Sequence, residues 1–162
     1  MAARGEHRYT ASLVWAGAAA GPTASYQSYS RAWRVEFDGK TALDGSADPT
    51  FRGDPARYNP EELLLTALAT CHMLSYLALC SLKGISVTSY RDRAEGTMAR
   101  GADGRTRFIS VRLHPEVTIA DGGKLDLARA LHENAHAECF IANSVNFPVE
   151  NAPTVTADSA VG

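Results

Sequence analysis

Apolar and polar residues alternate along two stretches near the start of the chain. Residues 9–15 follow a period of two, and residues 33–38 repeat the pattern. This alternation is typical of strands that have one buried face. The dipeptide Asp38-Gly39 predicts a tight turn after the second strand, and residues 44–58, rich in Gly, Asp and Pro, predict an irregular connection.

A long apolar segment follows this connection and predicts a central helix. Asn59 suits the N-cap, Pro60 the first helical position, and Glu62 the third position of a capping box. Gly84 is a typical C-terminal stop. The sequence therefore predicts a helix over residues 60–83, about 36 Å long at ~1.5 Å per residue.

The clearest alternation in the chain comes after this helix, over residues 108–119. Phe108 is expected on the polar side of this strand, and Pro115 suggests a sheet edge or a bulge. Asp103-Gly104 predicts a hairpin turn from a preceding strand at about residues 89–99. The apolar face is predicted to consist of Ile109, Val111, Leu113, Val117 and Ile119.

A second helix and a closing strand complete the pattern. Apolar residues recur at helical spacing from Leu127 to Ala135, which predicts a helix over residues 124–140. Residues 153–157 predict the closing strand. The order β–β–helix–β–β–helix–β indicates an α+β protein, and with no linker to divide it we expect a single domain over residues 1–162.

Composition narrows the choice of function. The chain has 162 residues, of which 45% are apolar and 21% charged, the balance of a soluble globular protein. Its formal net charge is −2, and it has no block of Lys or Arg. A nucleic-acid or anionic-membrane partner therefore has no electrostatic support.

The apolar segment over residues 63–82 carries no formal charge and is long enough to cross a bilayer. It is interrupted by hydroxyl groups and by His72, and no asymmetric basic cluster flanks it. A helix that is apolar on most faces can equally be the buried spine of a compact protein. We expect the second arrangement and no membrane partner.

Three cysteines cannot form a closed disulfide framework, and residues 1–21 lack the apolar core of a signal peptide. Both features favour a reducing, cytoplasmic location. In such a compartment most cysteines are inert core residues. A functional role for these three therefore needs support from their positions.

The positions allow one redox pair. Cys80 comes nine residues after Cys71 and so lies on the opposite face of the predicted helix. Cys139 lies at the end of the second helix, on its apolar face. Cys71 and Cys139 are thus the two thiols that can meet if the helices pack, and Cys80 is expected to be a packing residue.

Two segments resemble the OsmC/Ohr family of hydroperoxide-reducing proteins. Residues 59–63, with Cys71 ten residues after Glu61, resemble the start of that family's central helix. Residues 135–145 resemble the second-cysteine segment of an OsmC-like branch. The resemblance covers about residues 7–157. It implies antiparallel sheets around a long central helix, in an intertwined homodimer whose two central helices pack between the sheets.

The resemblance also implies a thiol peroxidase. Cys71 would be the peroxidatic cysteine and Cys139 the resolving cysteine, with an external dithiol as the reductant. Glu61 matches the family's glutamate, which holds an arginine that supports the thiolate. Arg52 is the best match for that arginine by its distance from Glu61. The other candidates are Arg57, Arg31 and Arg34. Neither a cofactor nor a metal is expected.

A competing motif lies on the second helix. His132, Glu133 and His136 satisfy the HExxH pattern of zinc peptidases, in which two histidines bind zinc and the glutamate activates water. The motif lacks a defined third ligand, since His72 and Glu138 would be arbitrary choices. The simpler interpretation makes His132 an exposed residue and His136 an ordinary helical residue near Cys139.

Three functions therefore stay open from the sequence. The first is a peroxidase acting through a Cys71–Cys139 disulfide, with organic hydroperoxides as its main substrates and hydrogen peroxide as a further candidate. The second is a non-catalytic, stress-related or binding dimer of the same fold. The third is a zinc hydrolase. His72 directly follows Cys71 and points away from it, so we expect a hydrogen-bonded histidine in the core or at an interface.

Overall fold

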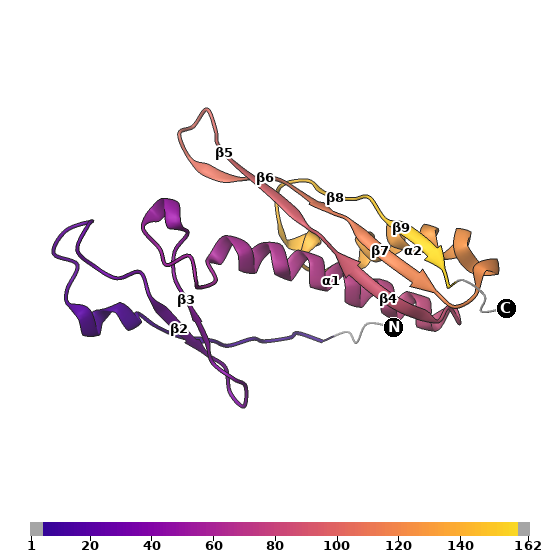
Figure 1. Ribbon diagram of the computed structural model, residues 1–162, viewed down its shortest axis with the longest axis horizontal. Coiled ribbons are helices and arrows are strands. Elements are labelled where there is room, and N and C mark those ends of the chain that lie inside the picture. The colour runs from indigo at the N-terminus through magenta and orange to yellow at the C-terminus, as the bar shows by residue number, and fades with distance from the viewer. Residues whose placement is uncertain (1–4, 159–162) are drawn as a thin grey trace. The chain divides into compact units, whose positions relative to one another are not determined.

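The computed structural model describes residues 5–158 and contains two compact units. One unit ends at Leu63, and the other begins at Leu64. The boundary falls inside the long helix α1 (Pro60–Leu82), which is drawn in Figure 1. Each unit has its own sheet structure and is described by itself.

The N-terminal unit contains a three-stranded antiparallel sheet in the order β1-β2-β3. Its strands are β1 (Ser12–Val14), β2 (Trp33–Glu36) and β3 (Leu43–Gly45). Short 3₁₀ helices span Ala16–Ala20 and Pro49–Phe51. The two predicted strands are present, and β3 is an additional strand at the start of the segment predicted to be irregular.

The ends of α1 follow the predicted capping chemistry. The backbone N–H of Glu62 donates to the side-chain oxygen of Asn59 at 2.8 Å, and the N–H of Asn59 donates to the Glu62 carboxylate at 3.2 Å. These bonds satisfy donors that the first turn of a helix otherwise leaves free. At the other end Gly84 has φ 66°, and the N–H of Ile85 donates to the Cys80 carbonyl at 2.8 Å. The predicted helix is confirmed to within one residue.

Two three-stranded sheets make up the β structure of the C-terminal unit. One has the order β4-β7-β9 and the other β5-β6-β8. The consecutive strands β6 and β7 join them through His114, and Figure 1 shows β4, β7 and β9 running side by side. Strands β8 and β9 pair in parallel with β6 and β7, while the other pairings are antiparallel. The bounds are β4 (Val87–Asp92), β5 (Glu95–Arg100), β6 (Thr106–Leu113), β7 (Pro115–Ile119), β8 (Val149–Asn151) and β9 (Thr154–Ala157).

The second predicted helix is present as α2 (Leu125–Glu138), preceded by a 3₁₀ turn over Gly122–Lys124. Asp121 caps this turn by accepting from the N–H of Gly123 at 2.9 Å. Helix α2 is amphipathic, and Ala128, Leu131 and Ala135 are buried. With two helices and nine strands over the described residues, the predicted α+β class is confirmed.

A β-bulge changes the predicted faces of β6. Thr97 of β5 pairs with Ser110, while the next residue of β5 pairs with Phe108, so Ile109 has no partner across the ladder. The extra residue inverts the alternation on its N-terminal side. Ile109 is therefore 46% exposed, and Phe108 packs inward against Phe147 with ring centroids 5.6 Å apart. The expectation that Ile109 shares the face of Val111 is wrong for this reason.

The core of the C-terminal unit consists of two separate apolar clusters. One contains Tyr76 with Val117, Ile119 and Leu131, and the other contains Leu68 with Val111 and Leu113. Along α1, Leu68 belongs to the second cluster and Tyr76 to the first, so the helix changes cluster between these two residues. Residue 72, a histidine, lies at that change.

Candidate active site

Helices α1 and α2 run antiparallel, which is visible in three successive contacts. The Tyr76 hydroxyl donates to the Ala128 carbonyl at 3.1 Å, near the start of α2. His72 Nε2 lies 3.1 Å from His132 Nδ1, further along α2. Cys71 lies near enough to Cys139, the C-cap residue of α2, to raise the pKa of its thiol. As residue numbers fall along α1 they rise along α2, so this packing brings the two cysteines together.

Cys139 is the buried member of the pair, with an exposed fraction of 1%, whereas Cys71 is half-buried. Both are free thiols. The backbone N–H of Ala142 donates to the Cys139 sulfur at 3.4 Å. Burial, together with the neighbouring Cys71 thiol, raises the pKa of Cys139 to about 11. At neutral pH Cys139 is therefore a protonated thiol, able to donate a hydrogen bond to its partner.

Cys80 lies outside this pair. It is fully buried in the apolar cluster that contains Tyr76, and burial raises the pKa of its thiol. Its burial among apolar side chains is that of a residue that fills the core. The prediction that Cys80 is a packing residue is confirmed.

The structure places His132 of the HExxH motif in the core, whereas His136 is half-buried. His132 has an exposed fraction of 1%, so the prediction of an exposed His132 is wrong. Its ring stacks on Tyr76 with centroids 3.8 Å apart and hydrogen-bonds to His72, which places it on the packed stripe of α2. His72 is also buried, as predicted, and its ring lies parallel to that of His132.

Burial keeps this histidine pair neutral. Desolvation, with a contribution from His136, lowers the pKa of His72 to about 4. Desolvation and His72 lower the pKa of His132 to about 4. Residues 5–158 contain no group of three or more His, Cys, Asp or Glu side chains placed to hold a metal ion. The first histidine of the HExxH pattern is thus paired with His72 in the core, and the pattern lacks a third ligand in the described part of the chain.

The remaining site candidates belong to the N-terminal unit. Glu61 lies in the first turn of α1. Arg52 has φ 66°, the left-handed backbone region that non-glycine residues rarely adopt, and its guanidinium makes one long hydrogen bond of 3.5 Å to the Gln27 carbonyl. Arg31, Arg52 and Arg57 line one surface pocket of this unit.

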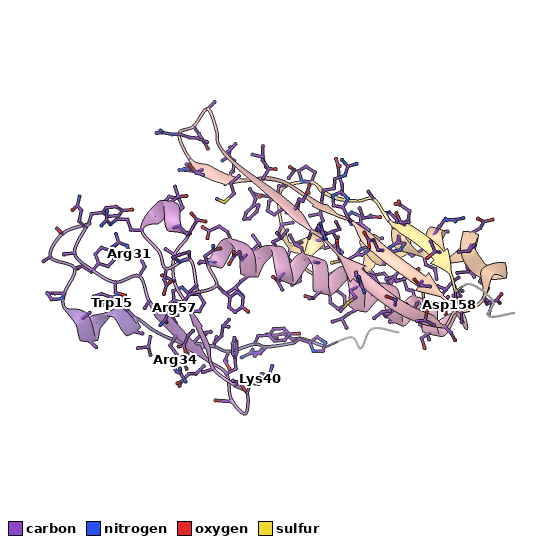
Figure 2. The ribbon with its side chains drawn as sticks, in the orientation of Figure 1. Trp15, Arg31, Arg34, Lys40, Arg57 and Asp158 are labelled. Carbon is purple, nitrogen blue, oxygen red and sulfur yellow. The ribbon has the colours of Figure 1, made fainter. Side chains whose placement is uncertain are left out.

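The other arginines differ in how firmly they are held. Arg31 donates to the carbonyls of Tyr26 and Tyr29, and its guanidinium lies 3.8 Å from the Tyr29 ring centroid. Arg34 is paired with Asp44 at 3.0 Å, and Arg57 lies 3.4 Å from Asp54. Figure 2 labels these three arginines in the N-terminal unit. Of the four candidates, Arg31 is the one fixed by both hydrogen bonds and aromatic stacking.

The sequence reasoning missed a set of buried polar groups in the C-terminal unit. Tyr90 and Asp92 of β4, His114 between β6 and β7, and Asn151 of β8 each have a buried polar atom without a hydrogen-bond partner among the described residues. Asp92 pairs across the ladder with buried Pro115, so its side chain faces inward. A carboxylate at an inward position of a strand is the signal that could have revealed it.

The C-terminal unit is thus an α+β unit with two neighbouring thiols, Cys71 and Cys139, near the contact of its helices. Residues 53–152 match the family model described as OsmC-like protein. The chain belongs to the OsmC-like family. No curated protein matches the sequence.

Solved structures agree with this assignment. An OsmC-like protein of unknown function from Vibrio cholerae is 33% identical, with 92% of this chain and 100% of that chain covered and a TM-score of 0.84. An organic hydroperoxide resistance protein OsmC from Legionella pneumophila is 20% identical over 93% of this chain and 99% of its own, with a TM-score of 0.65. One from Elizabethkingia anophelis is 18% identical over 94% and 99%, with a TM-score of 0.66. The predicted OsmC/Ohr-like fold and family are confirmed.

Proposed function

We propose that this protein is a cysteine-based peroxidase that reduces organic hydroperoxides through a Cys71–Cys139 disulfide. The observation that carries the proposal is the contact of a half-buried thiol, Cys71, with a buried one, Cys139, where α1 and α2 meet. The hydroperoxide resistance proteins among the structural neighbours add support.

The different burial of the two thiols supports different roles for them. Cys71 is the more accessible to a substrate, and Cys139 keeps its proton because its pKa is about 11. The Cys71 thiolate attacks a peroxide oxygen, the O–O bond breaks, and the alkoxide takes up a proton and leaves as an alcohol, which gives Cys71 sulfenic acid. Cys139 then attacks the Cys71 sulfur and water leaves. An external dithiol returns both thiols by exchange.

A guanidinium from the N-terminal unit, held by Glu61, would stabilise the Cys71 thiolate in this mechanism. A half-buried thiol needs such help, because burial disfavours the charged form. Arg52 and Arg31 are the first two residues to test. Arg52 has a strained backbone conformation and few hydrogen bonds, whereas Arg31 is held rigidly. We expect Arg→Lys at the supporting position to slow alkylation of Cys71 and the same change at Arg34 to leave it unchanged.

A second copy of the chain is the proposed partner. An 18-residue window of α1 has a mean hydropathy of 1.8, and 22% of it is buried. Leu74 and Leu82 are 62% and 80% exposed. By length and composition alone, α1 could span a membrane. Its hydroxyl groups and the buried side chains of His72 and Tyr76 favour a protein partner instead. We expect a dimer by light scattering and a monomer for Leu74→Glu. Extraction of the protein from cells only with detergent would contradict this proposal.

Thiol counting after oxidation tests the peroxidase. Of the three cysteines, the wild type should lose two on addition of one equivalent of cumene hydroperoxide, and peptide mass analysis should find Cys71 joined to Cys139. Cys80→Ser is the matched control, since it makes the same chemical change outside the pair and should lose the same two thiols. Cys71→Ser should keep both of its remaining thiols. A wild type that keeps all three would exclude the proposed function.

A further inference from the structure

The N-terminal unit contains a pocket of about 240 Å³ that is lined by three arginines. Arg31 and Arg57, both labelled in Figure 2, lie on two separate segments, and Arg52 comes from the second of them. A single acidic residue, Asp54, lies among them. Three guanidinium groups and one carboxylate give the lining a net charge of +2, in a chain whose formal net charge is −2. The pocket is therefore a local concentration of positive charge.

The carboxylate of the pocket already has protein partners for both of its oxygens. One oxygen of Asp54 accepts from the backbone N–H of Ala56 at 2.9 Å. The other lies 3.4 Å from Nε of Arg57. The carboxylate is thus paired with one arginine of the three. The charges of the other two, Arg31 and Arg52, have no acidic partner among the residues that line the pocket.

Arg52 has a strained backbone and a guanidinium that is almost unused. Its φ of 66° and ψ of 28° lie in the left-handed region that non-glycine residues rarely adopt. A guanidinium has five N–H donors, and among the described residues that of Arg52 makes one long hydrogen bond, to the Gln27 carbonyl at 3.5 Å. Residues with strained backbones cluster at ligand-binding sites, where the surrounding structure maintains them. Arg52 therefore has the most donors available to a ligand.

Arg31 differs from Arg52 because its guanidinium is already fixed by the protein. It donates to the carbonyls of Tyr26 and Tyr29, and it lies 4.7 Å and 3.8 Å from the centroids of their rings. Each terminal nitrogen uses one of its two hydrogens in these bonds, so further N–H groups of Arg31 remain available. A guanidinium held in this way loses little conformational freedom when it binds a ligand.

Two serine hydroxyls add further donors to the lining of the pocket. Ser46 Oγ accepts from the backbone N–H of Asp54 at 3.1 Å, and Ser30 Oγ accepts from that of Ala32 at 3.2 Å. Because each oxygen already accepts a hydrogen bond, its own hydrogen is the group left to donate. The side chains around the pocket therefore offer mainly donors, and a matching ligand must supply acceptors and negative charge.

We propose that this pocket binds a phosphate group, either that of a small phosphomonoester or inorganic phosphate. A phosphate dianion matches the two arginine charges that lack an acidic partner, and its oxygens accept hydrogen bonds from a guanidinium in pairs. A single carboxylate would match only one of these charges. The pocket has room for a phosphate and a few further atoms, because a water molecule in the liquid takes up about 30 Å³. The inference goes beyond the proposed function and does not rest on it, since no cysteine takes part.

Isothermal titration calorimetry of the reduced protein at low ionic strength tests the pocket, with inorganic phosphate, glycerol 3-phosphate, sulfate and succinate as probes. We expect one site for phosphate at pH 7.5, with a dissociation constant of about 1 mM or tighter. Tighter binding of glycerol 3-phosphate identifies a phosphomonoester as the ligand, and weaker binding identifies inorganic phosphate. At pH 5 a phosphomonoester is largely a monoanion, because its second pKa is about 6. Glycerol 3-phosphate should then bind several-fold more weakly, whereas sulfate should bind equally at both pH values.

Arg52→Gly is the sharpest variant, because glycine adopts a φ of 66° without strain while the guanidinium is lost. It should keep a melting temperature at or above that of the wild type and weaken phosphate binding by about tenfold or more. Arg57→Gln should also weaken binding, since it leaves the Asp54 carboxylate without its cation. Arg34→Gln is the matched control. This arginine of the same unit pairs with Asp44 and does not line the pocket, so its loss should leave binding unchanged.

Three results would overturn the phosphate site. They are no saturable binding up to about 10 mM phosphate, a folded Arg52→Gly protein that binds phosphate as the wild type does, and tighter binding of succinate than of either phosphate. An equal loss of binding in Arg34→Gln would also overturn it, because it would show attraction to the net charge of the unit alone. The result is separate from the peroxidase. A wild type that loses two thiols to cumene hydroperoxide but binds no phosphate overturns the pocket alone, and one that binds phosphate but keeps all its thiols overturns the peroxidase alone.

Discussion

His72 Nε2 and His132 Nδ1 lie 3.1 Å apart in a contact between α1 and α2 from which solvent is excluded. His132 also stacks on Tyr76, and His72 follows Cys71 in the sequence. A neutral imidazole pair at this point gives the helix contact a fixed register, because each ring has a single partner for its facing nitrogen. The same contact that holds the helices therefore also sets the positions of Cys71 and Cys139.

The histidine pair predicts loss of stability in acid. Both pKa values fall to about 4 in the folded protein, from 6.5 in the unfolded chain. Between these pH values the unfolded chain binds more protons, so the free energy of unfolding falls as the pH drops from 6.5 to 4. The loss should be on the order of a few kcal/mol. Thermal unfolding at a series of pH values measures it.

The control for this effect is a histidine outside the core. His7→Gln changes an exposed residue and should leave the pH dependence unchanged, whereas His132→Gln should flatten it because a buried titrating ring is removed. Asp92 opposes the trend, since its raised pKa lets the folded protein take up a proton as the pH falls. A melting temperature that is constant from pH 7 to pH 4.5 would show that the histidines are not buried as a neutral pair.

The thiol pair predicts a second titration. Because Cys71 contributes to the raised pKa of Cys139, Cys71→Ala should lower the pKa of Cys139 from about 11 toward its ordinary value. The ultraviolet absorbance of the thiolate, titrated in a Cys80→Ser background, measures the change. The raised pKa also means that the folded protein holds this proton longer than the unfolded chain, so stability should fall as the pH rises from 9 toward 11. An unchanged titration in Cys71→Ala would mean that the thiols are not in contact.

Local signals predicted much of this fold. Asn59, Pro60 and Glu62 predicted the start of α1, because capping depends on a few neighbouring groups. The alternation over residues 108–119 predicted that Val117 and Ile119 of β7 are buried. The spacing along the two helices allowed Cys71 and Cys139 to meet. Family resemblance supplied the roles of those thiols, which spacing could not.

The sequence could not predict features that depend on pairing between distant segments. The bulge at Ile109 exists only relative to β5, and the parallel strand β8 is three residues long. The sequence predicted an exposed His132, because nothing local shows that His72, sixty positions away, faces it. The buried polar groups on β4, on β8 and between β6 and β7 were missed for the same reason, since these segments are far apart in the sequence.

Because of the bulge, we expect truncation of two nearby apolar residues of β6 to lower the free energy of unfolding by different amounts. Val111 is 1% exposed in the apolar cluster with Leu68, whereas Ile109 is 46% exposed. Val111→Ala should lower the free energy of unfolding by about 2 kcal/mol, because it removes buried methyl groups and leaves a cavity. Ile109→Ala should change it by no more than about 0.5 kcal/mol. Urea unfolding of both variants measures the difference. Equal losses of stability would mean that Ile109 and Val111 share one buried face.

Loss of the hydrogen bond between Tyr76 and Ala128 should lower the free energy of unfolding. The Tyr76 hydroxyl donates to the Ala128 carbonyl at 3.1 Å, and both residues have no exposed surface. Tyr76→Phe keeps the ring stacked on His132 and leaves the carbonyl without this donor, so the free energy of unfolding should fall by about 1–3 kcal/mol. Tyr26→Phe removes the same atom from an exposed side chain and should cost almost nothing. If Tyr76→Phe is as stable as the wild type by urea unfolding, the first contact between α1 and α2 is not the one described, and the antiparallel register that brings Cys71 to Cys139 would have to be revised.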